Sequence, residues 1–397
     1  MIDGTLTIYK KDKDEYIIKN TGNGKYIKAG EKEVAYLLSF DENNTFADID
    51  ADRSKVNTLN DAEKKYLYDF FLKVKFIHSA DDSDSSSDVK ERKNIKKILE
   101  NITVIRLAHF DPDKFLEKTK KLFNCFFTVP AFILLIVLMV AGESALLKQV
   151  ENIDFDVLLK VDAKSMLFLV ISILPTGIIH EFAHAIACKH YGGGVHKVGF
   201  LLFYFMPAFY ADVSDIYIVK RKKHKLIICL AGIASNLVLA NVSLLAFTAL
   251  NAKGISIKFL FYYYILNLGT AVYNLFPYVK MDGYWVMQSF LNESNLMDKA
   301  KTMFYMSIYC HKNYKSLVNL EKKKKMTYLI CGLLMIISSL FFWGFGLDAI
   351  YGMVQRNINL LAAQIISFLM LILIIISLVL QHRTYCKAAR DNKFNWR

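Results

Sequence analysis

Proline and tryptophan are scarce in this sequence of 397 residues. Only five residues are proline and three are tryptophan, whereas 29 are phenylalanine and 22 are tyrosine. This composition excludes a collagen-like chain, a proline-rich array and an intrinsically disordered chain. The six cysteines include no C-x-x-C pair, so neither a disulfide framework nor a zinc-knuckle domain is indicated. The first hundred residues are polar and lack the apolar stretch of a secretory signal peptide, so none is expected.

Long apolar runs are what the sequence has in abundance, since 54% of its residues are hydrophobic. A helix needs roughly 20 apolar residues to cross the hydrocarbon core of a bilayer. Six runs reach about this length, and we predict spans at 122–140, 165–188, 226–250, 257–278, 326–346 and 360–380. The expected fold class is therefore a polytopic α-helical membrane protein with about six transmembrane helices.

The net charge is +13, and the basic residues are distributed unevenly among the segments between the predicted spans. Basic residues concentrate in segments that would share one side of the membrane: 1–121, 220–225, 288–325 and the tail after 381. The intervening segments 142–164, 251–256 and 347–357 are short and poor in lysine and arginine. The positive-inside rule then places both termini in the cytoplasm of a multi-pass cell-membrane protein. The charge is thus explained by topology and lipid headgroups, and no nucleic-acid partner is expected.

Residues 1–78 are expected to form a small separate α/β domain. Short runs rich in β-branched residues and tyrosine predict three strands, at Thr5–Tyr9, Tyr16–Lys19 and Lys25–Ala29. Apolar residues at helical spacing follow around Val34–Phe40 and over Tyr66–Phe76. The remaining predicted divisions are a Ser/Asp linker with a juxtamembrane helix at 79–121, a transmembrane domain at 122–380 and a basic tail at 381–397.

This order of strands and helices resembles the winged-helix recognition elements of ribosomally synthesised, post-translationally modified peptide (RiPP) pathways. The resemblance implies that the N-terminal domain binds a leader peptide as an added strand. The alternative is a small cytosolic domain that only docks on the membrane part.

The second predicted span contains the sequence His180-Glu181-Phe182-Ala183-His184. Residues four apart lie on one face of a helix, so the two imidazoles can bind one metal ion. Glu181 can then accept a proton from water at that ion. Zinc suits two imidazoles and one oxygen ligand. Ionisable side chains in an apolar span are costly, which favours a functional role.

A third ligand is expected from Asp282, which follows a proline and precedes a glycine where the fourth span breaks. Backbone that leaves the helix at this depth can turn a carboxylate inward. Under the predicted topology, the second and fourth spans run in the same direction, so Asp282 and the two histidines reach a similar depth. Asp212 and Asp215 are alternative carboxylate ligands. His190 and His196 are expected to be solvated loop histidines rather than ligands.

The pairing of H-E-F-A-H with N-L-F-P-Y-V-K-M-D-G about ninety residues later resembles the site-2 protease class of intramembrane zinc metalloproteases. The resemblance implies a zinc site formed by His180, His184 and Asp282, with Glu181 as general base. It also implies that Asn274 supports the substrate carbonyl, and it matches Asn236 to an asparagine of the third core span. The departures from the family pattern are Met281, Val279 and Ile233, which replace a leucine and two prolines.

An aromatic stretch at 198–215 follows the run Gly192-Gly193-Gly194. It is too short to cross the membrane twice as helices, so we expect it to dip in and return. It then either holds an extended substrate along an edge near zinc or only packs as a wall. With the zinc motif it resembles a subgroup of peptide-maturation metalloproteases found beside bacterial RiPP genes.

The leading hypothesis is a membrane zinc endopeptidase that cleaves a small precursor or leader peptide. A peptide or membrane-protein substrate, the bilayer, and an ABC transporter or peptide-modifying enzyme are the expected partners. One alternative is a non-proteolytic subunit that binds or exports peptides. Another is a regulatory protease that releases a membrane-anchored factor.

Overall fold

The computed structural model describes residues 6–12, 15–21, 25–41, 46, 49, 51–74, 76–77, 104–149, 151, 162–203, 206–255, 257–316, 320–357 and 360–391. The predicted Ser/Asp linker lies outside these residues. The chain divides into two compact units, one made of residues 1–128 and 184–224 and the other of residues 129–183 and 225–397. Helix α7 (Ala163–His190) contributes residues to both.

The first unit begins with an antiparallel sheet of three strands in the order β1-β2-β3, formed by β1 (Leu6–Asp12), β2 (Glu15–Asn20) and β3 (Lys25–Gly30). This confirms the three predicted strands. Alternate side chains of β2, including Tyr16 and Ile18, pack into a hydrophobic core. The other elements are α1 (Glu31–Leu38), the 3₁₀ helix η1 (Arg53–Thr58) and α2 (Asp61–Lys73). A capping box of Asn60 and Glu63 begins α2.

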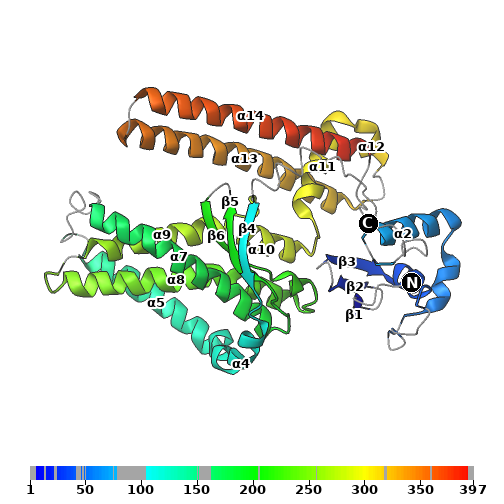
Figure 1. Ribbon diagram of the computed structural model, residues 1–397, viewed down its shortest axis with the longest axis horizontal. Coiled ribbons are helices and arrows are strands. Elements are labelled where there is room, and N and C mark those ends of the chain that lie inside the picture. The colour runs from blue at the N-terminus through cyan, green and yellow to red at the C-terminus, as the bar shows by residue number, and fades with distance from the viewer. Residues whose placement is uncertain are drawn as a thin grey trace. The chain divides into compact units, whose positions relative to one another are not determined.

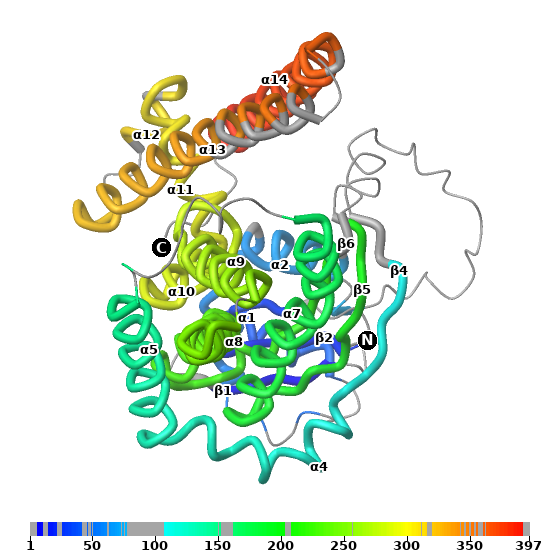
Figure 2. Tube along the Cα trace, turned by 90° about the vertical axis from the view of Figure 1, so that its left-hand side faces the viewer, coloured from blue at the N-terminus to red at the C-terminus, as the bar shows by residue number. Residues whose placement is uncertain are grey.

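A second sheet in the same unit joins segments that are far apart in the sequence. Its antiparallel strands are β4 (Val104–Phe110), β5 (Val198–Phe203) and β6 (Met206–Ala211), in the order β4-β5-β6. Figure 2 shows the three strands side by side. The aromatic stretch thus turns back on itself as a β-hairpin. Strand β4 was not predicted, because its segment was interpreted as linker and juxtamembrane helix. That helix is present as α4 (Asp113–Phe123).

Within the part of the chain that the structure describes, five helices are long and apolar enough to cross a membrane. They are α5 (Val129–Gln149), α7, α8 (Lys222–Asn251), the part Lys322–Phe341 of α13 (Lys322–Asn357), and Ala363–Arg390 of α14 (Leu360–Arg390). Figure 1 shows these long helices as coiled ribbons. These five candidate spans support the expected multi-pass membrane protein, for which about six were predicted. The side on which each segment lies stays a prediction.

Two predicted spans differ from the observed helices. The first was expected from residue 122, but α4 and the short 3₁₀ helix η2 (Asn124–Phe127) precede α5, which has Pro130 in its first turn. The fourth was expected over 257–278, whereas α9 (Lys258–Asn274) has 17 residues and does not meet the length of the other five. The chain leaves the helix there because Pro277 lacks the amide hydrogen that a continued helix would need.

The segment after α9 was expected to be a cytoplasmic connection, but it contains three helices. They are α10 (Asp282–Leu291), α11 (Leu296–Tyr309) and α12 (His311–Ser316). α11 packs against both α13 and α14, with Tyr284, Met303 and Tyr328 in the shared core. Within this core, the Tyr284 hydroxyl donates to Gln288 Oε1 at 2.9 Å and accepts from the Met297 amide at 3.1 Å. These contacts fix the orientation of α10, which begins at Asp282.

Candidate metal centre

The two histidines of the motif lie on one face of α7, one turn apart, as predicted. His180 is 9% exposed and His184 is 6% exposed, whereas Glu181 between them is half-buried. The helix ends at His190, and the chain continues through Gly192, whose φ of +91° is a backbone conformation that favours glycine. The buried imidazoles therefore belong to a continuous helix rather than to a loop.

Asp282 lies at the first position of α10, directly after the break that follows α9. The break is compact. A Cβ atom added to Gly283 would lie 2.2 Å from the carbonyl oxygen of Leu275 and 3.0 Å from that of Asn274. Glycine is therefore required for this close approach of the two backbones. The approach places Asn274, the last residue of α9, next to the start of the segment that carries Asp282.

Helices α7 and α9 run in the same direction, as the order of two contacts between them shows. The rings of Phe168 and Phe259 have centroids 5.6 Å apart, and the hydroxyls of Thr176 and Tyr263 are 2.8 Å apart. Beyond the end of α9, Asp282 meets His180. The order of these contacts along both segments brings the carboxylate to the level of the first histidine.

The three side chains form a group that could hold a metal ion. The distance between His180 Nε2 and Asp282 Oδ2 is 3.1 Å, and one ligand atom each from His180, His184 and Asp282 lies within 4.8 Å of the others. Two imidazole nitrogens and one carboxylate oxygen are a donor set that zinc prefers, and they leave a coordination position for water or substrate. The residues therefore fit a catalytic zinc site.

The two asparagines singled out in the sequence have different surroundings. Asn274 is half-buried at the end of α9. Asn236 on α8 is fully buried, and among the described residues neither its amide nitrogen nor its amide oxygen has a hydrogen-bond partner. A buried amide without partners is costly.

The alternative ligands do not join the group among the described residues. The carboxylate of Asp212 accepts from the hydroxyl and the amide of Ser214, in the turn that follows β6. Asp215 is bound elsewhere: it accepts from Lys19, Tyr26 and the amide of Gly194. This long-range pairing was not predicted, because nothing in local sequence spacing relates Lys19 to Asp215.

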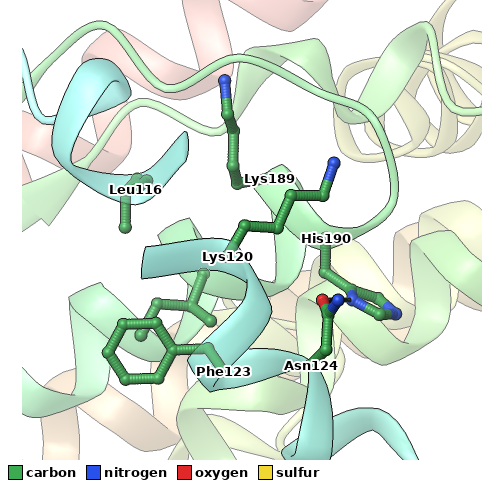
Figure 3. A pocket seen from close by; sticks show the side chains of 7 residues that line it. Leu116, Lys120, Phe123, Asn124, Lys189 and His190 are labelled. Atoms are coloured by element: carbon green, nitrogen blue, oxygen red, sulfur yellow. Dashed lines mark hydrogen bonds between the residues drawn. The ribbon is translucent and has the colours of Figure 1, made fainter. Parts of the chain in front are cut away.

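His190 and His196 lie outside the metal-binding group and contact other residues. Nδ1 of His190 lies 2.7 Å from Asn124 Oδ1, and its ring stacks on Phe127. His190 also lines a small pocket between α4 and the end of α7, shown in Figure 3. His196 is exposed and lies 3.5 Å from Asp111.

Comparison of the sequence with curated proteins finds a relative. Over 130 residues, 32% of this chain, the sequence is 32% identical to YydH of Bacillus subtilis (strain 168), a candidate peptide zinc metalloprotease. The match spans half of that protein's length. No protein-family profile matches the chain, and no solved structure matches it. The chain is thus a distant homologue of a candidate peptide zinc metalloprotease, and its own His180, His184 and Asp282 form a group that could hold a metal ion.

Proposed function

We propose that this protein is a membrane zinc endopeptidase that hydrolyses a peptide bond in a small precursor or leader peptide. The observation that carries the proposal is the convergence of His180, His184 and Asp282 from two segments about one hundred residues apart. Similarity to a candidate peptide zinc metalloprotease supports the same reaction class.

In the proposed mechanism, His180, His184 and Asp282 hold zinc, which when bound acidifies water and polarises the amide carbonyl. Glu181 accepts the proton of the attacking water and passes it to the leaving amine nitrogen. The Asn274 amide donates a hydrogen bond to the carbonyl oxygen as negative charge develops there.

Two sheets with outer strands support the proposed substrate class. In the N-terminal sheet β1 and β3 are the outer strands, and β6 is an outer strand of the second sheet. An extended peptide can add to such an edge through its backbone. We propose that the N-terminal sheet takes the leader and that β6 holds the segment to be cleaved. A peptide-modifying enzyme or an ABC transporter would act on the same precursor.

The test uses the full chain, coexpressed with small precursor peptides encoded beside its gene, and measures peptide mass and bound zinc. The wild type is expected to shorten one peptide, and E181Q is expected to lower the rate by at least roughly 100-fold while keeping its zinc. H180A and D282N are expected to lose zinc as well. E321Q, a change at an exposed glutamate, is the matched control and should behave as wild type.

The outcomes separate the competing functions. Cleavage by E181Q at the wild-type rate would contradict the mechanism. Zinc and peptide binding by the wild type without any cleavage would instead favour a non-proteolytic peptide-binding subunit. Cleavage restricted to a membrane-anchored regulatory factor would favour the regulatory protease.

A further inference from the structure

Asp215 is a buried carboxylate that the proposed chemistry does not use. It is 8% exposed and lies in the 3₁₀ helix η4 (Ser214–Tyr217), directly after the β5–β6 hairpin. Its Oδ1 accepts from Lys19 Nζ at 2.7 Å and from the hydroxyl of Tyr26, and its Oδ2 accepts from the Gly194 amide at 2.8 Å. A single side chain thus contacts three segments that are distant in the sequence.

The donors from the N-terminal domain form one unit. Lys19 on β2 and Tyr26 on β3 are directly opposite each other in the sheet, and the Lys19 ammonium lies 5.5 Å from the centre of the Tyr26 ring. Tyr26 also packs against Tyr217, with ring centroids 6.0 Å apart. A cross-strand pair therefore presents two hydrogen-bond donors to one carboxylate.

The burial of β2 shows that this face of the sheet is covered. Tyr16 and Ile18 point into the core of the N-terminal domain and are fully buried. Ile17 and Lys19 point to the opposite face, yet they are only 5% and 8% exposed. A lysine is rarely buried unless it is paired. The face of the sheet that carries Lys19 is therefore covered by other residues of the protein and does not face solvent.

The third donor connects Asp215 to the metal-binding helix. Gly194 lies in the loop between the end of α7 and the start of β5, so its bond to Asp215 closes the base of the hairpin. The bond from the Asp212 amide to the Lys197 carbonyl, 2.7 Å long, closes it again. A Cβ atom on Gly194 would lie 3.2 Å from Asp215 Oδ2, and one on Gly193 would lie 2.6 Å from Cys188 Sγ. The glycine run thus allows the carboxylate to reach the backbone.

We propose that Asp215 is a positioning residue that fixes the N-terminal sheet to the loop joining the metal-binding helix to the β5–β6 hairpin. The consequence for substrates rests on the proposed function. A peptide held by the N-terminal domain would reach the hairpin from one set direction, because the sheet is fastened to the base of that hairpin. Asp215 would therefore affect the binding of precursors that carry a leader, and it would leave the rate of the hydrolytic step unchanged.

The first test measures the contact without any activity. Hydrogen exchange is followed by mass spectrometry in the full chain, in lipid nanodiscs, for wild type, K19M, D215N and the double variant. Each single variant is expected to raise exchange by about tenfold both in β2–β3 and in the loop 191–197, since one buried charge loses its partner. The double variant should exchange no faster than the faster of the two single variants, because both changes remove the same hydrogen bond.

K55M is the matched control, because Lys55 pairs with Glu31 inside the N-terminal domain. It should leave exchange in the loop 191–197 unchanged. If K19M leaves that loop at the wild-type rate, the sheet and the loop are independent and the proposal is overturned. Should K19M fail to fold, Y26F removes a neutral donor to the same carboxylate and is expected to give the same pattern with a smaller increase.

The second test compares a precursor with the same peptide shortened to the segment around the cleaved bond. K19M and D215N should raise KM for the precursor about tenfold at unchanged kcat, and should cleave the short peptide as wild type does. Equal loss on both peptides would contradict a positioning role. A wild type that cleaves neither peptide would overturn the proposed function, while the exchange measurement still tests the contact.

Discussion

Gly283 controls the position of the Asp282 carboxylate. A side chain at this residue would meet the Leu275 carbonyl at 2.2 Å, which is backbone and cannot swing away. The start of α10, which carries Asp282, would therefore have to move away from the end of α9. Because a metal site depends on the convergence of its ligand atoms, a shift of this kind separates Asp282 from the histidines.

We predict that G283A binds less zinc than wild type and loses roughly 100-fold in peptide cleavage, the scale expected for a displacement of about 1 Å at a catalytic site. G269A is the matched control: it lies on α9, and a Cβ atom there meets nothing within 4 Å. Zinc content of the purified proteins and the cleavage rate check both variants. Wild-type zinc content in G283A would show that the backbone can relax without moving the ligand.

The residues of the metal group could be predicted because each leaves a local signature. His180 and His184 stand one turn apart in a continuous helix, and Asp282 follows a proline and precedes a glycine just beyond the end of a span. Lys19 and Asp215 leave no such signature. Their pairing depends on how the N-terminal sheet packs against the hairpin, and a lysine in a predicted strand is normally exposed. The burial of Asn236 could not be predicted either, since the burial of a residue on α8 depends on which helices pack against it.

At the scale of elements, α4 is joined to the end of α7 by two carboxylates, those of Asp113 and Glu117, which both contact Lys189. Asp113, in the first turn of α4, accepts from Lys189 Nζ at 2.8 Å and from the Val195 amide at 2.9 Å. Burial alone would raise the pKa of Asp113, but the hydrogen bonds from Lys189 and Val195 outweigh it and hold the pKa below its usual value. A lowered pKa in the folded state means that the ionised carboxylate stabilises this junction.

The pH dependence follows from that direction. The stabilisation should be fully present above the ordinary aspartate pKa of about 3.9 and should be lost as the pH falls through the lowered value. We predict that protection of the Val195 amide from hydrogen exchange, corrected for the intrinsic rate, is constant from neutral pH to about pH 4 and decreases below it. D113N should show the reduced protection already at neutral pH. D61N, at an exposed aspartate in the first turn of α2, should not.

The long helices and the first three strands were predictable, whereas β4 and α10–α12 were not. The helices repeat apolar residues over many turns, and β1–β3 are neighbours in sequence separated by turn residues. Strand β4 pairs with β5, which lies about ninety residues later, so its existence depends on a partner that local spacing does not reveal. Helices α10–α12 are short and mixed in polarity, and they are stabilised by packing on α13 and α14.

For the whole molecule, the question is whether α9 crosses the membrane. Its 17 residues extend about 26 Å, slightly less than a hydrocarbon core of about 30 Å. The contacts between α7 and α9 run in the same order along both helices, from Phe168 with Phe259 to Thr176 with Tyr263. Beyond the end of α9, Asp282 lies at His180. A helix parallel to a spanning neighbour over this length spans the same layer, so α9 is expected to cross with α7.

This expectation is tested by reporters fused after residues 255, 292 and 391, using green fluorescent protein for the cytoplasm and alkaline phosphatase for the outside. We predict phosphatase activity after residue 255 and fluorescence after residues 292 and 391, since the basic run Lys322–Lys325 and the tail favour the cytoplasmic side. If α9 does not cross, the fusions after residues 255 and 292 will report the same side. Asp282 would then enter the site from the opposite side of the membrane to that expected. A leader held by a cytoplasmic N-terminal domain would lie on the other side of the membrane from the end of α9.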